Sequence, residues 1–311
     1  MPGATLRLAT RGSPLARWQA AHVADLLHRR AGIDATPVIV ETAGDRDREA
    51  PLEEVGGQGI FVKEVQQAVL DGRADVAVHS AKDLPASVAV PGLVIGAVPE
   101  RADRRDTLVG ATLAGLARGA TVATGSARRR VQLAAARSDL AFVPLRGNLG
   151  TRLDRVGTGG IDAVLVAQAA LDRLGHWPAP GAHQVLEVEV MIPQVGQGAL
   201  ALECRVGDGA VREALGLVDH EPSHRELVAE RAFLARLGGG CSLPVGATAT
   251  ASAGGGASVT GMLAVDGGRT VVRATASGHD PVGVGSGVAG QLLDQVGAAW
   301  TAAPGAGGTV P

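Results

Sequence analysis

Apolar positions in the first two thirds of the chain follow two alternating periods, and each period predicts a different element. Short runs rich in β-branched residues, such as TLRLAT at 5–10, have the length and composition of strands. Between these runs apolar residues recur at helical spacing, as Ala16, Ala20, Val23 and Leu27 do. The predicted strands of this region lie at 5–10, 36–41, 75–80, 121–124, 141–145 and 162–167. Such alternation predicts an α/β fold of βα units around a mainly parallel sheet.

The pattern changes in the last third of the chain, where a helical run at 222–237 is followed by consecutive strand-like runs. The predicted strands lie at 245–251, 258–265 and 270–277, and a closing helix lies at 280–300. Glycine-rich stretches between these strands are typical of hairpin turns. We therefore expect a smaller C-terminal α+β domain, with a disordered tail from about residue 304.

Length and composition limit the possible classes of protein. A chain of 311 residues is long enough for two or three domains, and its mean hydropathy of +0.17 with 19% charged residues is ordinary for a globular protein. No apolar run reaches the roughly 20 residues of a membrane span, and the N-terminus lacks the pattern of a secretory signal. Cys204 and Cys241 are too few for a disulfide framework and lack zinc-site spacing. We expect a cytoplasmic protein with no metal and no membrane partner.

The charges are unevenly distributed although the net charge is only −2. Residues 101–155 contain eleven arginines and four aspartates, a local excess of seven positive charges. This excess predicts an anionic partner. A nucleic acid is disfavoured, because aromatic residues make up 2% of the chain and tyrosine is absent, which leaves no apparent stacking platform.

Three predicted strand-to-helix turns share one design. Ser13, Ser126 and Asn148 each stand where a helix N-cap belongs, and Pro14 follows Ser13 at the first helical position. Arginines flank all three turns: Arg11, Arg128, Arg129, Arg146 and Arg152. Backbone N–H groups, the positive end of a helix and a guanidinium together bind carboxylates or phosphates, and such turns line the ligand crevice of open α/β sheets. Three of them predict a multiply charged anionic ligand.

Seven motifs resemble those of the porphobilinogen deaminases in identity, order and separation, over nearly the whole chain. The motifs are LATRGSPLARWQA (8–20), GGQGIFVKE (56–64), ADVAVHSAKDLP (74–85), ATGSARRRVQL (123–133), LRGNLGTRLDR (145–155), VGQGALALECR (195–205) and LGGGCSLPVG (237–246). HSAKDLP and GGGCSLP are the most specific, whereas the region beyond the last motif matches loosely.

The resemblance implies a fold and a reaction. The fold has two lobes like those of type II periplasmic binding proteins and a smaller third domain, which we assign to 1–98 with 194–217, 99–193 and 218–311. The implied activity is that of a monomeric transferase of haem and tetrapyrrole biosynthesis. It deaminates four porphobilinogen molecules and joins them head to tail on a covalent dipyrromethane cofactor. Hydrolysis then releases linear hydroxymethylbilane, and ammonia is the by-product.

The resemblance also implies the site residues. Cys241, on a glycine-rich loop that predicts an accessible thiol, carries the cofactor through a thioether. Asp83 is the catalytic carboxylate, suited to moving protons and stabilising a cation beside the pyrrole. The remaining cofactor-binding residues are Lys82, Ser126, Arg128, Arg129, Gly147 and Asn148, and the substrate-binding residues are Arg11, Ser13, Phe61, Arg146 and Arg152.

Several assignments have alternatives. Phe61 fits either a hydrophobic core or stacking against a pyrrole ring, whereas His79 and Cys204 fit buried structural roles. Gln58 and Ala43 depart from the family, in which basic or polar residues are common at these positions. A two-lobed anionic solute-binding protein without catalysis would explain the three turns, but it would have no use for Asp83 and Cys241.

Overall fold

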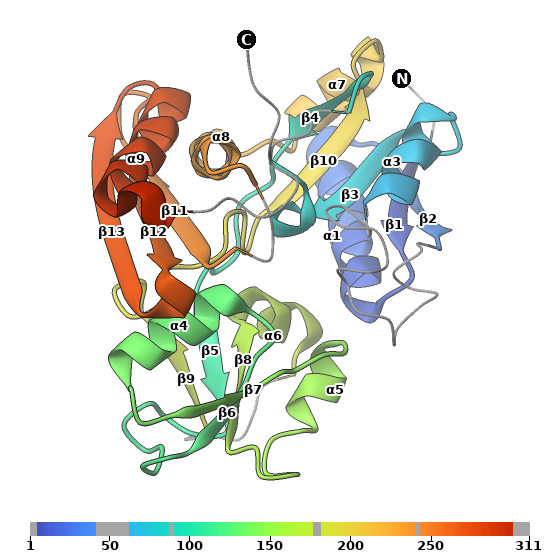
Figure 1. Cartoon of the computed structure of the whole chain (residues 1–311). Helices are drawn as coiled ribbons and strands as arrows, with labels where there is room; N and C mark the ends of the chain where they lie inside the picture. Colours follow the sequence, from blue (N-terminus) through green and yellow to red (C-terminus); the bar gives the residue numbers. More distant parts are fainter. Residues whose placement is uncertain (1–4, 42–61, 87–89, 177–181, 240–242, 301–311) are drawn as a thin grey trace. The chain divides into compact units, whose positions relative to one another are not determined.

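The computed structural model describes residues 5–41, 62–86, 90–176, 182–239 and 243–300. The chain divides into two compact units, one formed by Met1–Ala102 with Gly198–His224 and the other by Asp103–Gln197 with Arg225–Pro311 (Figure 1). The predictions that concern Ala43, Gln58, Phe61, Cys241 and the tail from residue 304 lie outside the described residues.

The first unit contains a five-stranded sheet in the order β2-β1-β3-β10-β4. Its strands are β1 (Leu6–Arg11), β2 (Ala35–Val40), β3 (Val76–Ser80), β4 (Leu93–Ala97) and β10 (Leu200–Arg205). β1 is parallel to β2 and β3, whereas β10 runs antiparallel to both β3 and β4. Four of the five strands therefore point in one direction, as the sequence predicted.

Helices cover both faces of this sheet: α1 (Pro14–Ala31), α3 (Lys63–Leu70) and α7 (Gly209–Gly216). Successive residues of a strand point to opposite faces. Leu8 accordingly packs in one cluster with residues of α1 and α7, and the adjacent Ala9 packs in another with residues of α3. Cys204 is fully buried in the first of these clusters, as expected.

The second unit repeats the same strand order in the sheet β7-β6-β8-β5-β9. Its strands are β5 (Asp106–Val109), β6 (Thr121–Ala123), β7 (Ala141–Val143), β8 (Ala163–Ala167) and β9 (His183–Leu186), and its helices are α4 (Ala127–Ala136), α5 (Leu149–Leu153) and α6 (Gln168–Leu174). β6 is parallel to β7 and β8, and β5 is antiparallel to β8 and β9. The repeated order confirms the expected pair of type II lobes.

A three-stranded antiparallel sheet, β11-β12-β13, completes the second unit. Its strands are β11 (Val245–Ala251), β12 (Ala257–Val265) and β13 (Thr270–Gly278), which pack with α8 (Glu221–Arg236) and α9 (Pro281–Val296). Phe233 of α8 is fully buried against Gly261 of β12, where any added Cβ would overlap its ring. This is the smaller α+β part that the sequence predicted.

The helices and strands named in the sequence analysis are present with small shifts in their ends. Strands β4, β5 and β9 were not predicted. In the described part of the chain, no helix is long and apolar enough to cross a membrane.

Candidate active site

Two of the predicted site segments meet at one edge of the first sheet. β1 and β3 are parallel neighbours, so their carboxyl ends lie at the same edge of the sheet. Arg11 is the last residue of β1 and Ser13 lies in the turn after it, while Lys82 and Asp83 lie in the turn after β3. The Oγ of Ser13 accepts a hydrogen bond from the backbone N–H of Ala16 at 3.3 Å, which confirms the predicted N-cap of α1.

Asp83 ends a short 3-10 turn, Ala81–Asp83, that begins directly after β3. The backbone N–H of Ala81 donates to the carbonyl of Ala199 at 3.0 Å, and that of Leu84 donates back to Ala81 at 3.2 Å. Ala81 and Leu84 are buried, whereas Lys82 and Asp83 are partly exposed. The turn is therefore fixed by its backbone while the Asp83 carboxylate remains accessible.

A buried polar cluster lies in β3 and its neighbours, close in sequence to this turn. The carboxylate oxygen Oε2 of Glu203 lies 3.0 Å from Nε2 of His79 and accepts a hydrogen bond from Nε2 of Gln66 at 2.8 Å. All three residues are buried. His79 thus has the structural role expected of it, and joins β3 to β10 and α3.

The turns that follow β6 and β7 lie side by side in the second unit, because these strands are parallel neighbours. The N–H of Thr124 donates to the carbonyl of Val143 at 2.9 Å. The two turns approach closely at Gly125, where an added Cβ would lie 2.8 Å from the carbonyl oxygen of Leu145. Ser126 accepts from the N–H of Arg129 at 3.4 Å, which confirms the cap of α4.

The turn after β7 gathers four of the predicted binding residues within a few positions. Asn148 Oδ1 accepts from the N–H of Thr151 at 3.0 Å, as predicted for a cap, and Nε of Arg152 donates to the carbonyl of Gly147 at 2.8 Å. Gly147 has a φ of 99°, and an added Cβ would also meet Thr151 at 2.9 Å, so glycine is required there. Arg146 is exposed beside it.

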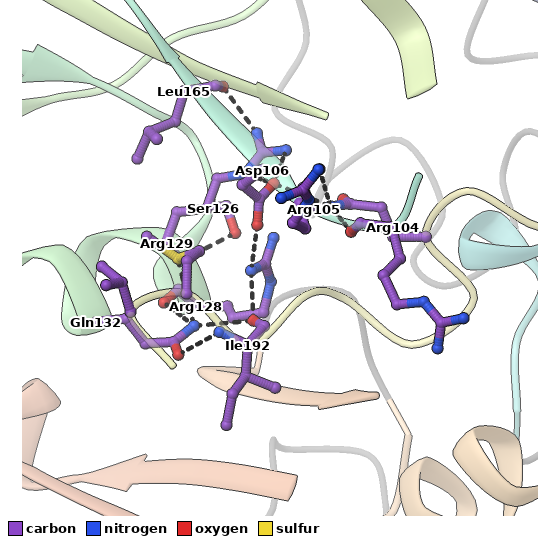
Figure 2. A network of polar contacts seen from close by, with 12 residues as sticks. Arg104, Arg105, Asp106, Ser126, Arg128, Arg129, Gln132, Leu165 and Ile192 are labelled. Atoms are coloured by element: carbon purple, nitrogen blue, oxygen red, sulfur yellow. Dashed lines mark hydrogen bonds and ion pairs between the residues drawn. The ribbon is translucent and has the colours of Figure 1, made fainter. Parts of the chain in front are cut away.

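Arg128 and Arg129 of α4 point toward Asp106, the first residue of β5 (Figure 2). Nη1 of Arg128 donates to Oδ2 of Asp106 at 2.7 Å. Nε and Nη2 of Arg129 both donate to Oδ1, at 2.9 and 2.7 Å. Asp106 is fully buried, and the two arginines are only 3% and 6% exposed. Both arginines are therefore buried charges and not surface groups.

Two glutamines and two carbonyls extend this network. Nε2 of Gln197 donates to Oδ1 of Asp106 at 3.0 Å, and Oε1 of Gln132 accepts from the N–H of Ile192 at 2.8 Å. The carbonyl of Ile192 also accepts from Nη1 of Arg128 at 2.7 Å, and the carbonyl of Leu165 accepts from Nη1 of Arg129 at 2.8 Å. The first turn of α4 is consequently held from several directions.

The electrostatics of this cluster leave one positive charge uncompensated. Burial alone would raise the pKa of Asp106, but Arg128 and Arg129 outweigh it and hold that pKa well below its ordinary value. Burial lowers the pKa of Arg128, an effect that Asp106 opposes. With one carboxylate and two guanidiniums the net charge is +1. Nε of Arg128 is buried and has no hydrogen-bond partner among the described residues.

This arrangement fits an anionic pyrrole cofactor. An unpartnered buried N–H of a guanidinium is costly unless an acceptor reaches it, and a carboxylate is the acceptor that suits its geometry. Both arginines were predicted as binding residues, whereas Asp106 and Gln132 were not. The one available signal was that Asp106 stands directly before the strand-like run Thr107–Val109, where a buried charge needs a partner.

The predicted residues therefore form two sets, each described within its own unit. At the sheet edge of the first unit lie Arg11, Ser13, Lys82 and Asp83, and at that of the second lie Ser126, Arg128, Arg129, Arg146, Gly147, Asn148 and Arg152. Nowhere in the described ranges do three or more His, Cys, Asp or Glu side chains form a group that could hold a metal ion.

Strand order defines a two-lobed α/β protein, and the turns at the strand ends carry groups suited to anions. A family model for the porphobilinogen deaminase dipyromethane cofactor binding domain matches residues 6–213, and one for the porphobilinogen deaminase C-terminal domain matches residues 224–294. The chain belongs to the porphobilinogen deaminase family. It is a transferase of tetrapyrrole biosynthesis with a dipyrromethane cofactor, and a solute-binding protein without catalysis is not favoured.

Curated relatives called porphobilinogen deaminase align over most of their length. The chain is 45% identical to one from a Roseiflexus species over 303 residues, covering 95% of this chain and 98% of the relative. It is 43% identical to one from Nitratidesulfovibrio vulgaris over 277 residues, covering 88% and 86%.

Among solved structures, the chain is similar to the methionine-binding protein MetQ, with a TM-score of 0.44 and 13% identity over 69% of this chain and 89% of the other. It is also similar to the VFT2 domain of Bordetella pertussis BvgS, with a TM-score of 0.41 and 20% identity over 69% and 86%.

Proposed function

We propose that this chain joins four porphobilinogen molecules head to tail with Asp83 as the catalytic carboxylate and Cys241 as the attachment point of the dipyrromethane cofactor. The observation that supports the binding site most strongly is the buried Arg128–Asp106–Arg129 cluster, with its net positive charge and the unpartnered Nε of Arg128. A carboxylate from the cofactor would supply the missing acceptor.

The proposed binding groups match the charge of the ligands. Each pyrrole ring carries an acetate and a propionate, so every added unit brings two carboxylates. Arginine forks and backbone N–H groups at the turns after β6 and β7 suit these groups. We assign Lys82, Ser126, Arg128, Arg129, Gly147 and Asn148 to the cofactor, and Arg11, Ser13, Phe61, Arg146 and Arg152 to porphobilinogen.

Asp83 would transfer protons at two atoms of the substrate. Its carboxyl group protonates the aminomethyl nitrogen of porphobilinogen, the C–N bond breaks, and ammonia leaves with the bonding electron pair. The carboxylate then stabilises the cationic methylene carbon. After a pyrrole α-carbon has formed the new C–C bond, the carboxylate removes the proton from that carbon. Each addition thus releases one ammonia, and attack by water at the end releases hydroxymethylbilane.

Cys241 is the better of the two cysteines for the thioether. When bound, dipyrromethane supplies the nucleophilic pyrrole carbon to which the first porphobilinogen is joined. Cys204 is fully buried, and burial raises the pKa of its thiol, so its thiolate form is disfavoured. The glycines before Cys241 and the GGGCSLP motif support the assignment.

We further propose the division into domains 1–98 with 194–217, 99–193 and 218–311, and a monomer that works in the cytoplasm. The strand orders and the family resemblance support the domains, and the family resemblance alone supports the monomer. The low cysteine content supports a reducing compartment.

The experiment that tests the catalytic assignment compares Asp83→Ala with Asp71→Ala in the full chain. Asp71 lies at the end of α3 and is exposed, so its removal should leave turnover unchanged. Asp83→Ala should lower the rate of porphobilinogen consumption by at least about 10²-fold, with a thermal midpoint close to that of the wild type. If both variants consume porphobilinogen at the same rate, Asp83 is not the catalytic carboxylate.

A further inference from the structure

We propose that Asp106 is a positioning residue, which holds Arg128 and Arg129 together as one carboxylate-binding unit with a single net positive charge. The inference rests on the proposed function and deepens it, because Asp106 itself is not assigned to cofactor or substrate. It would act through the two arginines.

Asp106 organises the donors of both arginines. Its two oxygens accept four hydrogen bonds, from Nη1 of Arg128, from Nε and Nη2 of Arg129, and from Nε2 of Gln197. Oδ1 accepts three of these bonds and Oδ2 accepts one. An ionised carboxylate only accepts hydrogen bonds, so Asp106 cannot itself bind a ligand carboxylate, which is also an acceptor. It therefore orients other groups and does not bind the cofactor.

The hydrogen bonds described for Arg128 leave one edge of its guanidinium available. Both bonds use Nη1, one to Asp106 and one to the carbonyl of Ile192, each at 2.7 Å. Nε has no partner among the described residues although the residue is only 3% exposed. Because Nη1 is held by two hydrogen bonds, Asp106 and Ile192 fix the direction in which the Nε edge of the Arg128 guanidinium points.

The charge of Asp106 also keeps the two arginines together. Two guanidiniums buried beside each other repel, and α4 has no acidic residue in its first turn to oppose this repulsion. Asp106 forms ion pairs with both arginines, and the cluster of three side chains keeps a net charge of +1. One ligand carboxylate would therefore neutralise the cluster, and no second carboxylate would be compensated there. If Asp106 had only a structural role, its removal would lower stability without slowing cofactor attachment in the folded protein. If it positions the arginines, its removal would also slow attachment.

The test follows cofactor attachment in full-length apoprotein prepared without a supply of porphobilinogen. Porphobilinogen is added to the wild type, Asp106→Asn, Asp106→Glu and Asp139→Asn, and denaturing mass spectrometry records the gain of two linked pyrrole units with time. Asp139 is a matched control, since its carboxylate also pairs with an arginine of the same unit, Nε of Arg137 at 2.7 Å, outside the proposed site. Rates are divided by the folded fraction measured by circular dichroism.

We expect Asp106→Asn to acquire the two-pyrrole mass at least about tenfold more slowly than Asp139→Asn, because the arginines lose their alignment. Asp106→Glu should recover part of the rate, since it restores the charge. Once loaded, Asp106→Asn should show a lower kcat with little change in KM for porphobilinogen, because the affected groups hold the primer and not the incoming substrate.

Equal attachment rates and kcat values in folded Asp106→Asn and Asp139→Asn would overturn the inference. If Asp106→Asn does not fold, the double variant Asp106→Asn/Arg128→Gln is used in its place, because it keeps the net charge of the cluster at +1. Attachment of the cofactor to this double variant as fast as to Asp139→Asn would again overturn the inference. If the wild type and Asp139→Asn also fail to gain the mass, the proposed function fails and the inference falls with it. The two failures are therefore distinguishable.

Discussion

Besides orienting the two arginines, Asp106 contributes to the free energy of unfolding. It is fully buried and forms charged hydrogen bonds to two buried guanidiniums. Removing one partner from a buried ion pair typically costs about 3–5 kcal/mol, because the remaining charge stays buried without compensation. The network therefore contributes both to the free energy of unfolding and to the proposed binding site.

The pH dependence of this contribution follows from the direction of the pKa shift. The pKa of Asp106 is lowered in the folded state, whereas in the unfolded chain it is about 3.9. The unfolded state therefore binds the proton first as the pH falls. The stabilisation by Asp106 is fully present above about pH 5 and is lost progressively as the pH falls below about 4 toward the folded-state pKa.

Urea unfolding of the wild type and Asp106→Asn at several pH values checks this expectation. The difference in their free energies of unfolding should be constant between about pH 5 and 8 and should shrink below about pH 4. A difference that changes with pH between 5 and 8 in this comparison would mean that Asp106 is not fully ionised there.

Single residues were predictable from the sequence where their partners are local. The caps Ser13, Ser126 and Asn148 each bond to an N–H three residues ahead, which sequence spacing alone can indicate. Asp106 lies in β5, 22 and 23 residues before its arginine partners in α4. Such a contact depends on how the sheet packs against α4, which local sequence patterns do not reveal. The sequence therefore indicated the excess of arginine in this region but not the carboxylate that pairs with it.

At the scale of elements, α4 departs from the usual charge pattern of helices. Its first turn contains three arginines and no acidic residue, although positive charge is unfavourable near a helix N-terminus by a few tenths to about 1 kcal/mol for each group. Asp106 and the capping Ser126 offset this cost from outside the helix. Such a departure from the usual preference for acidic residues in the first turn of a helix is typical of a binding site.

The cap of α4 gives a prediction about stability. Ser126→Ala removes the acceptor of the Arg129 N–H, so the free energy of unfolding should fall by about 0.5–2 kcal/mol. Ser126→Thr keeps a hydroxyl at the same position and is the matched control. Urea unfolding of the three proteins measures the effect, and a Ser126→Ala variant as stable as Ser126→Thr would show that the cap contributes nothing.

The longest elements were predictable from the period of their apolar positions. The helical spacing of Ala16, Ala20, Val23 and Leu27 predicted α1, and the strands of the C-terminal sheet were found because they have seven to nine residues. β5 has four residues, all buried, so it shows no alternation of apolar and polar positions.

At the scale of the whole molecule, the two five-stranded sheets have one order but obtain their antiparallel strand from different parts of the chain. In the first sheet this strand is β10, the last in sequence, whereas in the second it is β5, the first in sequence. The chain passes between the units at 102–103, at 197–198 and again at 224–225. Local patterns do not reveal such pairing, and only the family resemblance predicted it.

The arginine excess of residues 101–155 predicts how substrate binding depends on salt. Porphobilinogen carries two carboxylates, and screening lengths shorten to roughly 10 Å at 0.1 M salt and 3 Å at 1 M. KM for porphobilinogen should therefore rise as sodium chloride is increased over this range, while circular dichroism shows an unchanged fold. A KM that does not depend on salt would contradict electrostatic binding of the substrate.

The measurement that tests the central claim most directly is the denaturing intact mass of the full chain after incubation with porphobilinogen. The wild type and Cys204→Ala should both carry an added mass equal to two linked pyrrole units, because Cys204 is buried in the first unit. Cys241→Ala should lack it. An unmodified wild type, or a Cys241→Ala variant that still carries the two-pyrrole mass, would contradict the account.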